Sequence, residues 1–239
     1  MVSWLRYTLS GILAAGFVTG MVFLVKETRT RHARLECSSI EVFLADDYRF
    51  LNEEDVKKLV LERYGNVEGK TLDSLDLSRI ESLLDSQSAV LKSQAWTTDE
   101  GILHVSITQR KPEIRFLNGK EGFYVDATGY IFPLFERFTA ECPLIRGPLP
   151  SDEQWISRTL DLVEYMKPYW MARTDSIGVN RKGQLSFRMD GGKEEYFFGA
   201  PDNFSTKFAK IKDYCEKIRP EGREYTKVDL TYTKQIICR

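Results

Sequence analysis

The residues that could carry catalytic chemistry are few in this chain, and their spacing fits no catalytic motif. The two histidines, His32 and His104, are far apart, and neither belongs to an HExxH or a comparable metal-ligand spacing. The run from Gly65 to Thr71 resembles a phosphate-binding loop, but three residues separate its glycines where the motif needs four. A helix is also expected before it, where the motif needs a strand. We interpret this run as the end of a helix and a turn.

The acidic residues Asp46, Asp47 and 53–55 could suggest a cation site, because carboxylate oxygens bind hard cations. They lack the spacing of an EF-hand loop, and acids in the first turn of a helix already complement the helix dipole. We therefore predict no catalytic, metal or cofactor site, and a protein that is not an enzyme. One enzymatic alternative stays open, an envelope enzyme acting on cell wall through two carboxylates, because such a pair needs no motif.

The four cysteines, Cys37, Cys142, Cys215 and Cys238, are scattered and form no CxxC pair. A zinc site is therefore poorly supported. In an oxidising compartment four cysteines permit three full pairings, and the sequence does not choose between them. We interpret them as buried free thiols, because free cysteine is among the residue types most often buried. Disulfides are the alternative.

The distribution of charge argues against a nucleic-acid-binding protein. The net charge is −1, and five of the basic residues precede residue 36, so the rest of the chain is mildly acidic. Binding to nucleic acid needs a clustered basic face, which such a body does not offer.

The segment Tyr7–Val25 contains no charged residue and is about as long as the roughly 20 residues that span a bilayer. A cleaved signal peptide would have a shorter apolar core and a small-residue cleavage site, whereas Lys26, Glu27 and Arg29 follow here. We therefore expect a transmembrane helix. Basic residues are more frequent after the segment than before it, where Arg6 stands alone, which by itself favours a cytoplasmic body. That rule is weak for long domains.

The chain after the membrane segment first shows the order strand, helix, helix, strand, strand. Ile40, Val42 and Leu44 alternate as in a half-buried strand. Asn52 is expected to cap a helix by accepting from the backbone N–H of Asp55. The other elements expected here are the end of that helix at Gly65, a short helix over 76–84, and a hairpin of strands 90–98 and 102–110.

The remainder is richer in strands and contains two helices. Ser151 and Gln154 form a capping-box pattern that predicts a helix over 152–167, ended by Pro168. A clean apolar stripe predicts a second helix over 203–217. The expected strands are 122–125, 130–133, 176–180, 184–189, 195–198, 227–232 and 235–238.

Taken together, these motifs resemble the FtsQ/DivIB family of bacterial cell-division proteins, and especially its members from Bacteroidetes. The element order from Cys37 to Arg110 looks like a POTRA domain, and Val105–Pro112 (VSITQRKP) resembles the family's strand that ends in Arg and Pro. Phe123–Pro133 (FYVDATGYIFP) is similar to its Val-Asp-x-x-Gly hairpin, and Lys227–Tyr232 (KVDLTY) to its final strand. The resemblance covers essentially the whole chain.

The resemblance implies an α+β fold with one membrane helix. The implied layout is a cytoplasmic tail over 1–6, a transmembrane helix over 7–25, a juxtamembrane linker over 26–36, a POTRA domain over 37–111 and a partner-binding β domain over 112–239. It also implies a body in the periplasm, an anchor in the cell inner membrane and concentration at the division septum. This topology overrides the weak charge signal because the match runs along the whole chain.

The function implied by the resemblance is that of a non-catalytic septal scaffold without a cofactor. Such a protein binds the single-pass proteins FtsB and FtsL and influences septal peptidoglycan synthesis through them. A terminal strand at a sheet edge can take a partner strand, because its backbone groups are unpaired. By position, the implied contact residues are Leu230, Thr231, Tyr232, Thr233, Lys234, Gln235 and Ile236.

Two departures from the family pattern bear on this site. Thr231 stands where the family often has Arg, and Lys234 and Gln235 replace the usual small Ser-Gly pair. A partner strand would therefore meet different side chains. The alternative function is a membrane-tethered POTRA chaperone or envelope assembly factor.

Overall fold

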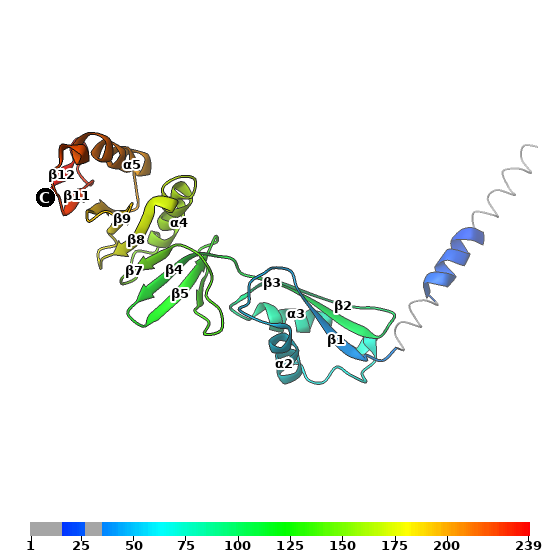
Figure 1. Cartoon of the computed structure of the whole chain (residues 1–239). Helices are drawn as coiled ribbons and strands as arrows, with labels where there is room; N and C mark the ends of the chain where they lie inside the picture. Colours follow the sequence, from blue (N-terminus) through cyan, green and yellow to red (C-terminus); the bar gives the residue numbers. More distant parts are fainter. Residues whose placement is uncertain (1–15, 27–34) are drawn as a thin grey trace, which may run out of the picture. The chain divides into compact units, whose positions relative to one another are not determined.

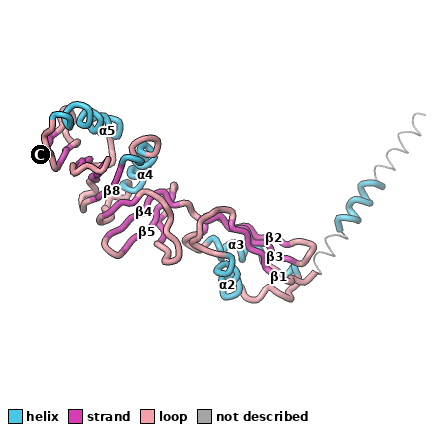
Figure 2. The backbone as a smooth tube through the Cα atoms, viewed as in Figure 1, coloured by secondary structure: helices cyan, strands magenta, loops and turns pink. Residues whose placement is uncertain are grey.

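The computed structural model describes residues 16–26 and 35–239 (Figure 1). The chain divides into two compact units, Met1–Gln109 and Arg110–Arg239. Both mix helices with strands, and the second unit is the richer in strands (Figure 2). The α+β class expected from the sequence is therefore confirmed.

Residues 16–26 form an exposed helix. The expected transmembrane helix over 7–25 lies partly outside the described residues. The tail over 1–6 and most of the linker over 26–36 also lie outside them. Within the part of the chain that the structure describes, no helix combines the length and the apolar character that a bilayer crossing needs.

The first unit contains a three-stranded sheet in the order β1-β3-β2. Strand β1 runs parallel to β3, and β2 runs antiparallel to it. Helix α2 packs against β1 and helix α3 against β2, and the core lies between the helices and the sheet. The bounds are β1 Ser39–Leu44, α2 Glu53–Arg63, the 3-10 turn Leu72–Ser74, α3 Leu77–Asp85, β2 Val90–Thr97 and β3 Ile102–Gln109.

Helix α2 begins where the sequence predicts it. The Asp55 amide donates to Asn52 Oδ1 (2.8 Å), and the Asn52 amide donates to Asp55 Oδ2 (3.1 Å). This reciprocal capping box satisfies two donors that the start of a helix leaves free. At the other end Gly65 has a φ of +104°, and its amide donates to Val60 O (3.1 Å). Only glycine adopts that conformation without strain, so the helix ends there.

Gln109, the last residue of β3, is buried and ties the loop after β1 to the sheet. Its side-chain amide donates to Asp46 Oδ1 (3.0 Å) and Tyr48 O (2.5 Å). Its side-chain oxygen accepts from the Leu51 amide (2.9 Å). A buried amide that pairs on both sides fixes this loop, because each of these groups would otherwise be costly to bury unpaired.

The second unit is built on a nine-stranded sheet in the order β12-β11-β10-β9-β8-β7-β4-β5-β6. Helices α4 and α5 supply much of its core, in which Trp155 meets Phe116 edge-on and Phe208 packs on Phe187 and Phe198. The strands are β4 Pro112–Asn118, β5 Glu121–Asp126, β6 Ile131–Pro133, β7 Leu144–Arg146, β8 Thr174–Val179, β9 Leu185–Met189, β10 Glu195–Gly199, β11 Lys227–Asp229 and β12 Ile237–Cys238. The helices are α4 Trp155–Met166 and α5 Phe204–Asp213, the latter followed by a π-helical turn, Tyr214–Ile218; 3-10 turns cover Met171–Arg173 and Arg219–Glu221.

The capping box expected before α4 is wrong. No side chain caps the helix start at Gln154, and the Gln154 amide donates to Asp152 Oδ1 (3.0 Å). The carbonyl of Asp152 also accepts from the Trp155 amide (3.0 Å). Asp152 therefore forms a turn of its own before the helix, which moves the first helical residue to Trp155.

The second expected helix, over 203–217, is not a single α-helix. Its stripe is confirmed at Phe208 and Ile211, which are buried. After Asp213 the chain widens into the π-helical turn. This turn brings Tyr214 to 0% exposure, although the expected stripe did not include that residue.

The last two expected strands are shorter than the sequence indicates. The strand expected over 227–232 ends at Asp229, and the strand expected over 235–238 begins at Ile237. Strand β12 forms one edge of the nine-stranded sheet, and β6 forms the other edge.

Candidate partner-binding edge

The seven residues expected to contact a partner lie in the connection between β11 and β12, beside helix α5 (Figure 1). Leu230 is fully buried, and its amide donates to Phe197 O (3.0 Å). Ile236 is half-buried against the same core. The exposed members are Thr231, Tyr232, Thr233, Lys234 and Gln235.

The end of β11 has a local cause. Asp229 Oδ1 accepts from the Thr231 amide (3.0 Å) and from Thr231 Oγ1 (2.6 Å). Such a side-chain turn competes with a strand ladder and bends the backbone. The neighbouring strand β10 ends at Gly199, whose φ is +77°. A Cβ atom there would lie 2.6 Å from Thr231 Cγ2, so the chain crosses close to β10 at this point.

Strand β12 leaves one side of its backbone unpaired with the sheet. The Lys227 amide donates to Arg239 O (3.0 Å), and the Arg239 amide donates to Lys227 O (2.9 Å). In an antiparallel pair, residues that exchange both bonds alternate with residues that exchange none. Cys238, opposite Val228, is of the second kind, so its N–H and C=O point away from β11. This is the open edge of the sheet.

The backbone of the connection is also open. Within residues 35–239, the amides of Tyr232, Thr233, Lys234, Gln235 and Ile236 donate no hydrogen bond to protein. An exposed chain with free amides next to a short edge strand can pair with another strand.

Helix α5 holds the beginning of this connection through one lysine. Lys210 Nζ donates to Leu230 O (3.1 Å) and to Tyr232 O. The pKa of Lys210 is lowered, first by burial and then by the positive charge of Lys207, with Asp229 opposing the shift.

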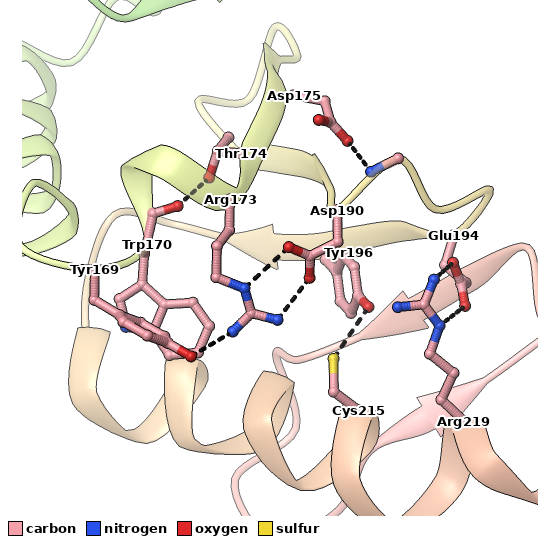
Figure 3. A network of polar contacts seen from close by, with 11 residues as sticks. Tyr169, Trp170, Arg173, Thr174, Asp175, Asp190, Glu194, Tyr196, Cys215 and Arg219 are labelled. Atoms are coloured by element: carbon pink, nitrogen blue, oxygen red, sulfur yellow. Dashed lines mark hydrogen bonds and ion pairs between the residues drawn. The ribbon is translucent and has the colours of Figure 1, made fainter.

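Behind the edge, a polar network joins β10 to the π-helical turn (Figure 3). Glu194 is paired with Arg219 (3.2 Å) and accepts from Tyr214 Oη (3.3 Å). Tyr196 Oη lies 3.6 Å from Cys215 Sγ. Burial raises the pKa of Tyr214 to about 12 and also raises the pKa of Tyr196. Both phenols are therefore neutral at pH 7 and can donate hydrogen bonds.

A second part of the network joins the start of β8 to the end of β9 (Figure 3). Arg173 donates to both carboxylate oxygens of Asp190 (3.0 and 2.6 Å) and to Tyr169 Oη (2.9 Å). Its guanidinium also lies over the rings of Tyr169 and Trp170. Hydrogen bonding to Arg173 lowers the pKa of Asp190. Planar two-point pairing of this kind positions a carboxylate rigidly, so the network holds strands and helix together.

The sequence analysis did not identify these network residues. They are ordinary Arg, Asp, Glu and Tyr side chains separated by up to about 50 positions, and the fold alone brings them together. The π-helical turn is a local feature with functional associations, and no sequence pattern marked it.

The Val-Asp-x-x-Gly hairpin has a structural role at the start of the second unit. Asp126 accepts from Arg110 Nη1 (2.6 Å), from the Thr128 amide and Oγ1 (2.9 and 2.6 Å) and from the Tyr130 amide (3.0 Å). The Arg110 guanidinium lies 3.8 Å from the centre of the Tyr130 ring. Burial alone would raise the pKa of Asp126, but the bonds from Thr128, Arg110 and Tyr130 outweigh it, and the pKa is lowered.

The four cysteines are free thiols, of which Cys37 is buried and the others are half-buried. Burial raises the pKa of Cys142 to about 11 and also raises that of Cys238. Among residues 16–26 and 35–239, no three His, Cys, Asp or Glu side chains are placed to hold a metal ion.

Comparison with known families gives two matches. Residues 111–239 match the family model described as FtsQ/DivIB, C-terminal related. Residues 35–108 match the model described as a POTRA-like domain. A search of curated proteins gave no match.

Proposed function

The chain belongs to the FtsQ/DivIB family, and from that premise we propose that it is a non-catalytic scaffold of the bacterial division septum. The family match spans more than half of the chain. The POTRA-like match covers the unit before it, in the order expected for this family. A role in cell division is therefore the function best supported by the chain.

The proposed partners are single-pass division proteins of the FtsB and FtsL type. The observation that carries this proposal is the open edge of the nine-stranded sheet at β12, next to an exposed connection with free amides. A partner strand that pairs with this edge would gain backbone hydrogen bonds, and the exposed side chains of the connection would select it. Through such partners the protein would influence septal peptidoglycan synthesis.

The proposed contact keeps the residues 230–236 but gives them different roles. Leu230 is part of the core, so it would anchor the connection to the core and would not contact the partner. Tyr232, which is 44% exposed, and Lys234 would meet the partner with their side chains. Gln235 and Ile236 would join β12 and lengthen it when a partner strand docks, because their amides are free to enter a ladder.

The proposed location is the cell inner membrane, with residues 7–25 as the single span, the body in the periplasm and the protein concentrated at the septum. This proposal rests on the apolar run of the sequence and on the family. The layout of a POTRA domain over 37–111 and a β domain over 112–239 is part of the same proposal.

Depletion of the protein in its own organism tests this function. We expect depleted cells to grow without dividing and to form filaments, and we expect a fluorescent fusion to gather at midcell. Restoring the wild-type chain should restore division. If depleted cells divide normally and instead fail to assemble outer-membrane proteins, the scaffold proposal is wrong and an envelope assembly factor replaces it.

A further inference from the structure

We propose that Lys210 is a positioning residue of the partner-binding edge, because it holds the start of the β11–β12 connection in the shape that a partner meets. That Lys210 holds the connection is argued from the geometry. That this matters for partner binding rests on the proposed function. Lys210 is half-buried on helix α5, and its ammonium group reaches the carbonyls of Leu230 and Tyr232.

The two carbonyls are separated by one residue, so the backbone from Leu230 to Tyr232 curves around a single ammonium group. An ammonium carries three donors and no acceptor, which suits it to bind several carbonyls at once. The carbonyl of Thr231, between them, has no such bond to Lys210. Lys210 therefore fixes the direction in which the chain leaves the core at Leu230.

No other described side chain makes a hydrogen bond to the connection beyond Thr231, although Ile236 near its end packs against the core. Leu230 is fixed by its bond to Phe197 O, and Thr231 by Asp229. From Tyr232 to Ile236, within residues 35–239, the one hydrogen bond from another element is that from Lys210. Loss of this bond would release the connection while leaving Leu230 in the core.

The ammonium group of Lys210 is stabilised by its two carbonyl contacts and by the negative charge of Asp229. Burial and the charge of Lys207 lower its pKa, and no carboxylate of the described residues lies within ion-pair distance. Burying an ammonium group is costly unless it is hydrogen-bonded. The neighbouring Lys207 differs, because it pairs with Asp202 and Ala200 O and serves the loop before α5.

A connection held in one shape binds a partner more tightly than a mobile one, because less freedom is lost on binding. Replacing Lys210 with methionine keeps the length and apolar stem of the side chain but removes the donors. We expect Lys210→Met to leave the fold intact, to loosen the connection, and to weaken partner binding by roughly 5- to 10-fold.

The first measurement does not involve a partner. Full-length Lys210→Met is treated with trypsin at low concentration, and release of the segment after Lys234 is followed by mass spectrometry. We expect cleavage several-fold faster than in the wild type. Lys212→Met is the matched control, because Lys212 lies on the same helix, has a side chain that is 66% exposed and, among the described residues, pairs only with Glu216. Lys210→Arg, which keeps donors, should restore slower cleavage.

The second measurement is co-purification of single-pass division proteins with the same variants. Faster cleavage together with weaker co-purification in Lys210→Met, and neither change in Lys212→Met, supports the proposal. Unchanged cleavage overturns the positioning role, and faster cleavage with unchanged co-purification overturns its importance for binding. If the wild type itself binds no division protein, the proposed function fails. The cleavage result still tests whether Lys210 holds the connection in place.

Discussion

Asp126 accepts four hydrogen bonds at the start of the second unit, and its side chain is 6% exposed. Its partners come from both sides of the sequence, since Arg110 precedes β4 and Thr128 and Tyr130 lie in the following turn. The motif residues that identify the family thus act here by fixing the first strands of the sheet. Breaking such a buried charged pair leaves the remaining charge uncompensated.

We predict that Asp126→Asn lowers the free energy of unfolding by about 3 kcal/mol at neutral pH. Because the folded-state pKa of Asp126 lies below the ordinary value of 3.8, this stabilisation is present above pH 4 and is lost as the pH falls through the folded-state pKa. Urea unfolding at several pH values measures it. The control is Glu121→Gln, an exposed acid on the same hairpin; an equal loss in both variants, or a loss for Asp126→Asn that persists in acid, would contradict the prediction.

At the residue scale, the sequence predicted features that depend on neighbouring residues alone, such as a helix cap. Asn52 has a matching acid three residues later, and both bonds of its capping box form. Ser151 and Gln154 fit the same pattern, but Asp152 lies between them and forms its own turn. Lys210 could not be recognised as important, because the carbonyls it binds lie about 20 positions away and belong to a segment whose path only the fold determines.

At the element scale, most strands were predicted, including the three-residue strand β6, while two were missed. Strand β3 alternates along its whole length and was delimited closely. Strands β4 and β7 were not delimited, and β7 has only three residues, too few for a periodic pattern. The ends of β11 and β12 were misplaced because a turn around Asp229 and the end of the neighbouring strand β10 decide them. Alternation in Val228, Leu230 and Tyr232 carried no sign of either.

The two helix starts give a matched test of the caps. We predict that Asn52→Ala destabilises the first turn of α2 by about 1 kcal/mol, because the bond from the Asp55 amide to the Asn52 side chain is lost. Ser151→Ala should change the start of α4 by less than about 0.5 kcal/mol, as is usual for surface changes. Hydrogen exchange of the amides in each helix measures both. A large effect of Ser151→Ala would mean that the expected capping box forms after all.

At the scale of the whole molecule, the order of elements in the first unit was predictable because its helices and strands have clear local patterns. The sheets were not predictable from such patterns, since they bring β1 beside β3, β4 beside β7 and β10 beside β11 as parallel pairs joined by long connections. Pairing between strands that are far apart in the sequence is not indicated by any local sequence pattern. The placement of β12 at an open edge, on which the proposed site depends, follows from this topology and not from any motif.

The central claim is that single-pass division proteins bind the β12 edge. The most direct measurement is quantitative co-purification from the native organism with three full-length chains, each first shown to be folded. These are the wild type, Tyr232→Ala with Ile236→Lys, and a control at other exposed positions, Leu149→Ala with Ile131→Lys. Ile131 is 43% exposed in β6, the opposite edge of the same sheet.

We predict that FtsB- or FtsL-like proteins co-purify with the wild type and with the control, and are lost from the variant of Tyr232 and Ile236. Equal recovery with all three chains would contradict the proposed edge. Recovery of no division protein with any of them would contradict the scaffold function itself.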